Sequence, residues 1–227
     1  GTIGVPILPM SAAPSGIQYD GMGCGSSMTG YAAVSFSHIA TAGAYVILDI
    51  AVDRNVTLTN VQYGGQSMTL LGSARFTGYG GDAGIWRYGY VNAPGGISTV
   101  TATLSANSYF SANTTSYTGV GAVADAETTS GNGSVPSQTV TTTSEKLIVE
   151  SIGVYAHVLG TLGGGKNLFS FTHANISLAI NESNASDTFT VGLTGVNWGA
   201  ISNVLSAVTA SIDAALAVTA TETGTAT

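Results

Sequence analysis

Hydrophobic and polar residues alternate along much of this chain with the two-residue period of β-strands. Residues 97–104 are one example, because Val100, Ala102 and Leu104 fall on one side and threonines on the other. Residues 44–52 form instead an almost continuous apolar run, which is typical of a strand buried on both faces. Asp49 interrupts this run, and we expect it to have a partner inside the core.

Turn signals separate about a dozen such segments. Gly64-Gly65, for example, predicts a tight hairpin between residues 58–63 and 66–71. Many short strands with glycine-rich turns favour an all-β fold, an antiparallel two-sheet β-sandwich of the jelly-roll-like kind. Besides 44–52 and this hairpin, strands are expected at residues 84–91, 97–104, 109–118, 135–142, 145–155, 174–181, 187–193 and 200–209.

The pattern divides the chain into an extended N-terminal arm (1–30), a β-sandwich domain (31–209) and a C-terminal tail (210–227). The arm opens as a strand with one apolar side, and Pro6 restricts that strand to pairing along one edge. We expect the arm to pack on another subunit. The candidate subunit-interface residues are Ile3, Val5, Ile7, Leu8 and Met10.

Three segments do not follow the strand pattern. Residues 21–30, GMGCGSSMTG, have the composition of a flexible loop, and the Ser/Gly/Asn-rich residues 128–134 are also predicted to be a loop. Residues 203–217 approach the apolar spacing of a helix, which competes there with a strand.

Charge is scarce. Charged residues make up 7% of the chain, against about 25% in an ordinary domain. The net charge is −7, and the five basic residues are dispersed along the sequence, so neither nucleic acid nor an anionic membrane is an expected partner. A surface so poor in charge indicates either a hydroxyl-rich secreted domain or one covered by neighbouring subunits.

Targeting and disulfide signals are few. No run of 18 apolar residues predicts a membrane span. The sequence opens at Gly1 without a signal-like region, so we expect that a signal peptide or initiator methionine has been removed or is left out of the numbering. Cys24 is the single cysteine, which precludes an intramolecular disulfide.

The residue spacings that support catalysis or metal binding do not occur. His38, His157 and His173 fit no zinc-binding pattern, and we expect them on the surface or in loops. No nucleophile elbow is found. The carboxylates are expected to be solvated or hydrogen-bonded rather than paired for hydrolysis, and they are Asp49, Asp53, Asp82, Glu150 and Asp187. The sequence therefore predicts no enzyme, no metal and no cofactor.

Two surface features were considered as binding or modification sites. Trp86, Tyr88 and Tyr90 fall on one face of a strand and form a candidate glycan-stacking face, although such a row more often packs in a sheet core. Six Asn-x-Ser/Thr sites would matter only in an organism that glycosylates them, and they begin at Asn55, Asn113, Asn132, Asn175, Asn181 and Asn184.

Four segments carry a resemblance to a known family: YGGQSMT (63–69), IWRYGYVNAPGG (85–96), TVTATLS (99–105) and SYTGV (116–120). Their succession resembles a β-sandwich module of tail and other virion proteins of bacteriophages, especially actinobacterial ones, and of bacterial surface proteins. The resemblance continues through EKLIVESIGVY (145–155) to about Leu205, and it excludes the first 30 residues. It implies a structural or host-contacting role without catalytic residues.

The expected function is therefore that of a structural subunit of a phage virion, such as a minor tail, fibre or capsid-decorating protein. Its expected partners are other copies of itself, other virion proteins and a host-surface glycan. The alternatives are an extracellular filament or surface-layer subunit joined by donor-strand insertion, and a carbohydrate-binding adhesin. The corresponding locations are the virion or, in the alternatives, the extracellular space or cell surface.

Overall fold

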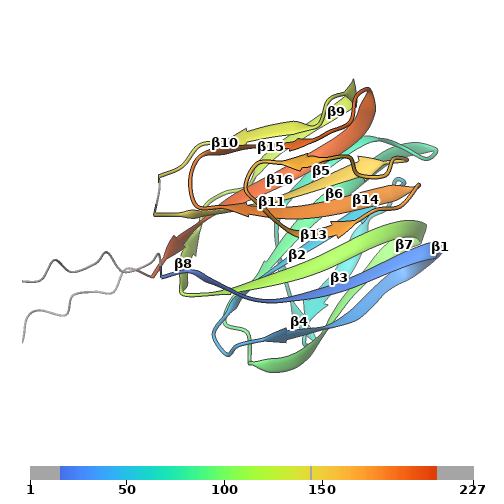
Figure 1. The fold of residues 1–227 in the computed structure, drawn as a ribbon. Helices are drawn as coiled ribbons and strands as arrows, with labels where there is room; N and C mark the ends of the chain where they lie inside the picture. The colour runs from blue at the N-terminus through green and yellow to red at the C-terminus, as the bar shows by residue number, and fades with distance from the viewer. Residues whose placement is uncertain (1–15, 144, 209–227) are drawn as a thin grey trace, which may run out of the picture.

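The computed structural model describes residues 16–143 and 145–208, and every regular element within them is a β-strand (Figure 1). The all-β class is thereby confirmed. The strands form three hydrogen-bonded sheets that pack against one another, where two sheets were predicted. No helix in the described ranges is long and apolar enough to cross a membrane.

The first sheet is organised around the 23-residue strand β7 (Gly96–Thr118). β1 (Gln18–Ala40) pairs along one side of β7 for its whole length. The other side of β7 is shared: β3 (Leu58–Tyr63) pairs with its first half and β2 (Tyr45–Val52) with its second. Beyond these lie β4 (Gln66–Ser67), next to β3, and β6 (Gly81–Tyr90) and β5 (Thr69–Gly78), next to β2.

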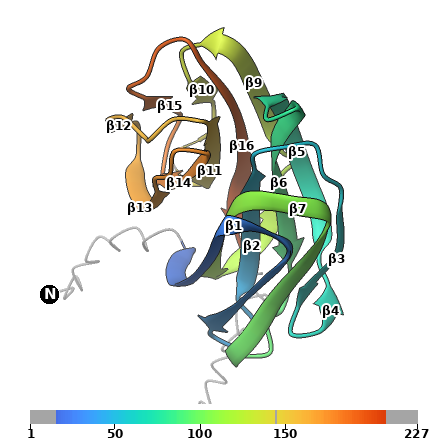
Figure 2. The same ribbon diagram turned by 90° about the vertical axis from the view of Figure 1, so that its right-hand side faces the viewer.

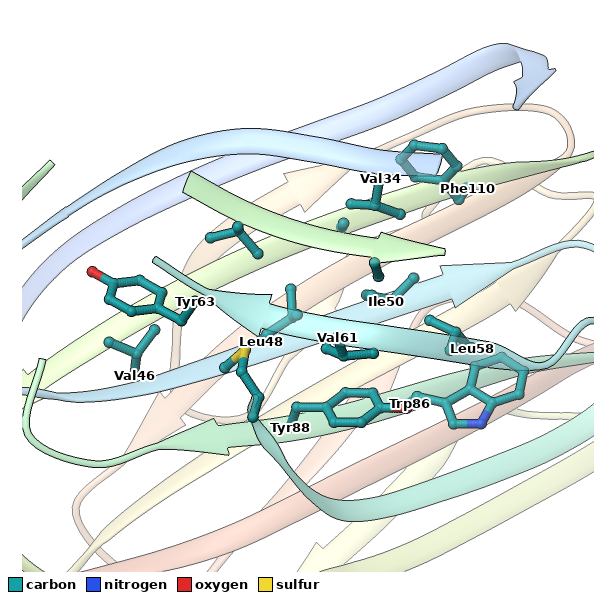
Figure 3. Close-up of a cluster of buried hydrophobic side chains, with 14 of the residues drawn as sticks. Val34, Val46, Leu48, Ile50, Leu58, Val61, Tyr63, Trp86, Tyr88 and Phe110 are labelled. Atoms are coloured by element: carbon teal, nitrogen blue, oxygen red, sulfur yellow. The ribbon is translucent and has the colours of Figure 1, made fainter. Parts of the chain in front are cut away.

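The first sheet folds over on itself because the long β1–β7 ribbon bends midway. The resulting interior joins side chains of β2 and β6 to side chains from β3 and the first half of β7 (Figure 3). Leu48, Ile50 and Val100 are each fully buried there. We call this cluster the folded core.

The second sheet has the order β13–β14–β11–β16–β8, and β9 also pairs with β16. The third is a small sheet in the order β10–β15–β12. Seen edge-on, the layers run from β3 and β4 at one side to β12 and β15 at the other (Figure 2). The bounds are β8 (Val120–Val123), β9 (Glu127–Ser134), β10 (Ser137–Val140), β11 (Leu147–Tyr155), β12 (Leu162–Gly163), β13 (Lys166–Phe171), β14 (Ile176–Ser183), β15 (Asp187–Val191) and β16 (Val196–Ala207).

Apolar side chains fill each space between layers. Ile47 and Ile85 of the first sheet pack against Val149 and Ile201 of the second. On its other face, the second sheet buries Ile152 and Trp198 beside the third sheet. β2 has no exposed residue, so the prediction of a strand buried on both faces is confirmed. The Gly64-Gly65 hairpin is confirmed too, with φ values of 56° and 78°.

The prediction of a flexible loop at residues 21–30 is wrong, because these residues lie within β1. The glycines alternate, so Gly21, Gly23 and Gly25 share one face of the strand. This face meets the folded-over second half of β1: a Cβ atom on Gly23 would lie 2.6 Å from the carbonyl oxygen of Ser37. The glycines thus permit close contact between two backbones.

Two further predictions are corrected. Residues 128–134 belong to β9, which pairs with β16 although most of its side chains are exposed and none is strongly apolar. Residues 203–207 of the candidate helix belong to β16, and the rest of that segment lies beyond Val208, outside the described residues. The predicted strands at 97–104 and 109–118 are the two halves of β7.

Substitution of Gly23 tests the close approach within β1. We expect Gly23→Ala to lower the free energy of unfolding by about 1–3 kcal/mol, because its methyl group would collide with backbone that cannot simply rotate away. Urea denaturation measures this loss. Cys24→Ala is the matched control, since Cys24 is exposed on the opposite face of the same strand. Equal effects of the two substitutions would contradict the assignment.

Candidate assembly site

The predicted interface residues Ile3, Val5, Ile7, Leu8 and Met10 lie outside the described residues. The structure does show where this segment joins the fold. The backbone of Gly16 lies directly against Gly119, and its α-carbon faces Ala207 of β16. The amide of Val208 donates to the carbonyl of Gly119 over 2.9 Å. Both ends of the described chain therefore meet beside β8 (Figure 1).

A groove of about 480 Å³ opens next to this meeting point. It lies between β8 of the second sheet and the first sheet, which contributes Tyr45, Leu71 and Val91. No charged side chain lines it. Among the described residues β8 pairs only with β16, so the backbone groups along its other edge have no strand partner. We call this feature the β8 groove.

The outer edge of β1 is a second surface without a strand partner, because within the described chain β1 pairs only with β7. Four of the eleven exposed large apolar side chains of the described residues belong to this one strand. They are Tyr19, Met22, Tyr31 and Ile39. Ile97, which is 73% exposed, lies directly opposite Ile39 on β7 and extends the surface.

The only carboxylate of β1 is held internally. Asp20 accepts hydrogen bonds from the backbone amide of Thr41 at 2.9 Å and from the hydroxyl of Ser116 at 2.8 Å. Although burial opposes ionisation, these hydrogen bonds hold the pKa of Asp20 below its usual value. Asp20, which is half-buried, therefore connects β1 to Thr41 and to β7.

The candidate glycan-stacking face is not on the surface. Trp86 and Tyr88 are buried in the folded core, and Tyr90 is half-buried against it (Figure 3). They point there because β3 and the first half of β7 fold over that side of β6. A sugar ring cannot reach Trp86 or Tyr88 without opening the core, and the alternative of sheet-core packing is what the structure shows.

Two of the six glycosylation sequences are also inaccessible in the folded chain. Asn113 and Asn181 are 1% and 2% exposed, inside the sheet layers. Asn55, Asn132 and Asn184 are exposed, and Asn175 is half-buried.

The histidines do not converge. His38 is buried, contrary to the expectation of a surface position: its Nδ1 lies 2.9 Å from the hydroxyl of Thr114, and its ring meets Tyr63 edge-on. Burial lowers the pKa of His38. His157 is exposed and His173 half-buried. In the part of the chain that the structure describes, no three His, Cys, Asp or Glu residues gather to hold a metal ion.

Asp49 does have the partner that its buried position requires. Arg87 on β6 donates to both of its carboxylate oxygens, from Nε over 2.8 Å and from Nη2 over 2.9 Å. The remaining guanidinium nitrogen, Nη1, donates to the carbonyl of Val149 on β11 over 2.6 Å. Ser151 donates to Asp49 over 2.8 Å. The pair is almost entirely excluded from solvent and joins the first sheet to the second.

Glu150 is next to this cluster in sequence, but it faces the other side of β11. It is fully buried, and one carboxylate oxygen accepts a hydrogen bond from Asn181 over 2.7 Å. Burial raises the pKa of Glu150 to about 8, since Asn181 and the more distant Arg87 offset only part of the desolvation. Glu150 and Asp49 therefore do not form a catalytic carboxylate pair.

The remaining carboxylates have separate environments. Asp53 pairs with Arg54 at 3.0 Å and accepts a hydrogen bond from Ser108 at 2.7 Å. Asp187 accepts from the amide of Gly165 at 2.8 Å, and Asp82 is exposed.

The sequence did not reveal the β8 groove or the exposed edge of β1. Segments distant along the chain form the β8 groove, so no local pattern marks it. The alternation of glycine at positions 21, 23 and 25 reflects the close approach within β1 and does not mark its exposed edge.

Comparison with known proteins adds no family: no family model, no curated protein and no solved structure matches this chain.

The buried ion pair predicts an asymmetry between single and double substitutions. Arg87→Met should lower the free energy of unfolding by about 3–5 kcal/mol, because it leaves the Asp49 carboxylate buried without a cation. Adding Asp49→Leu should restore much of that loss, since it removes the remaining charge. Urea denaturation at neutral pH measures both effects.

Arg75→Met provides the matched control, because Arg75 is an exposed arginine on the neighbouring strand β5. Its loss should cost about 1 kcal/mol or less. A mild effect of Arg87→Met, comparable with this control, would contradict the structural role of the pair.

Glu150 predicts a pH dependence of stability. Between the unfolded pKa near 4.5 and the folded pKa near 8, the unfolded chain releases a proton that the folded chain keeps. The free energy of unfolding should therefore fall by about 1 kcal/mol per pH unit across this window. Glu150→Gln, which retains an oxygen to accept from Asn181, should remove this component. An unchanged slope between pH 5 and 8 in urea titrations of the variant would refute the assignment.

Proposed function

We propose that this chain is a structural subunit of an extracellular assembly, in the first place of a phage virion as a minor tail, fibre or capsid-decorating protein. The observation that carries the proposal is the 23-residue edge strand β1, which has exposed apolar side chains and a single carboxylate, Asp20. Bulges interrupt this edge, but within the described residues it has no lysine, proline or covering strand, which soluble monomers often use to protect an edge. A subunit whose edge is covered by a neighbour has no need of that protection.

The composition supports the same role. With 7% charged residues, the surface offers little electrostatic repulsion between copies. The resemblance of residues 45–120 to virion modules favours a phage particle over a bacterial surface layer. The jelly-roll-like classification, which rests on the many short strands and glycine-rich turns, is retained as part of this proposal. Quantitative mass spectrometry of purified particles and of cell-envelope fractions distinguishes the two locations.

Self-association is the property to measure. The full chain should form oligomers in sedimentation velocity experiments as its concentration rises. Ile39→Lys places a charge on the exposed β1 surface and should weaken association at least tenfold without altering the melting temperature. Val135→Lys is the control, since Val135 is similarly exposed but lies outside β1. A chain that stays monomeric up to millimolar concentration would contradict the proposal.

A further inference from the structure

The β8 groove has the form of a site for an added strand. Tyr45, Leu71 and Val91 line one side and the four residues of β8 the other, and Asn92 adds one polar side chain to this uncharged groove. β8 offers backbone donors and acceptors along an edge that no described strand covers. An occupant therefore needs an extended backbone and apolar side chains on alternate positions, which is the requirement of β-augmentation.

Residues 3–7 of this chain meet that requirement. Ile3, Val5 and Ile7 would share one face, and in a strand their amides and carbonyls would also point to one edge. Pro6, which has no N–H, would then turn its backbone to the opposite edge, where no partner is needed. Five residues span about 16 Å, enough to cover a four-residue strand. Neither the segment nor the groove contains a charged side chain.

The position of Gly16 favours the groove of a neighbouring copy. Gly16 is the first described residue, and it touches Gly119, one residue before β8. Residues 1–15 are therefore attached beside the β8 groove of their own subunit. To enter that groove, residues 8–15 would have to turn back on themselves within a short distance. An extended linker instead carries residues 3–7 away from this groove, and Pro9 and Pro14 are compatible with an extended linker because the residue before a proline favours extended conformations. An extended linker of eight residues reaches up to about 28 Å.

We propose that residues 3–7 of one copy add as a strand to β8 of the next copy, with Ile3, Val5 and Ile7 filling the β8 groove. This inference rests on the assembly role proposed above and specifies its contact. The contact is heterologous, because the segment of one subunit meets the groove of another, so repetition builds a ring or a filament. Pro6 on the outer edge prevents a third strand from adding.

Two full-length variants test the contact. Val5→Asp places a charge in the segment, and Val91→Asp places one in the groove at a side chain that is 62% exposed and therefore tolerant in the monomer. Each variant alone should lose the head-to-tail contact. A mixture of the two should form one-to-one dimers of about twice 22.7 kDa, because only the intact segment of Val91→Asp fits the intact groove of Val5→Asp.

Sedimentation velocity with the wild type and Val158→Asp as references distinguishes the outcomes. Val158, 55% exposed, follows the end of β11 remote from β8, so this variant should assemble like the wild type. If the wild type assembles and neither Val5→Asp nor Val91→Asp changes its mass, this contact is refuted while the assembly role stands. A monomeric wild type whose melting temperature falls in both variants would place the segment in its own groove and would overturn both proposals.

Discussion

The arrangement of the layers depends on the buried ion pair of Arg87 and Asp49. Apolar packing is not directional, so two sheets with apolar faces could slide past each other at little cost. A buried guanidinium is different, because every donor that loses its partner costs free energy. Arg87 binds Asp49 within its own sheet, but it reaches the carbonyl of Val149 on β11 only when the first and second sheets take one relative position. The pair thus specifies which of many apolar packings is formed.

This internal use of charge also shapes the surface. Of the five basic residues, Arg87 is buried and Arg54 is paired with Asp53, which leaves three for the outside. Asp49 and Glu150 are likewise buried, and the hydrogen bonds of Asp20 are all internal. A chain with 7% charged residues that places several of them inside has few charged side chains on its exterior. The charged residues that orient the sheets are thus not available on the surface. A surface with few charges would offer less electrostatic repulsion between the copies of the proposed assembly.

The sequence predicts a strand or turn correctly where neighbouring residues determine it, and fails where contacts between distant segments determine it. β2 and the Gly64-Gly65 hairpin were predictable, because their apolar run and their glycines act within a few residues. β9 was not predictable, because it has no apolar pattern. Its pairing with β16, which is distant in sequence, holds it in place. The glycines of β1 were misread because their reason is a contact with residues 36–39 of the folded-over strand. The burial of Trp86 likewise follows from the bend of β7, which no local pattern encodes.

Within the described residues β1 and β8 are two of several strands that pair along one edge only, and they are suited to different contacts. β1 is long, but its pairing register shifts near Gly21 and on both sides of Tyr31, so bulges divide it into short stretches. Such interruptions twist an edge and limit uninterrupted pairing with other chains, which guards against open-ended aggregation. β8 is only four residues long and stands beside an apolar groove, so backbone pairing there also requires matching side chains. In the proposed assembly, selectivity would therefore reside at β8 and β1 would contribute exposed area, so that an assembly using both could be ordered although little charge guides it.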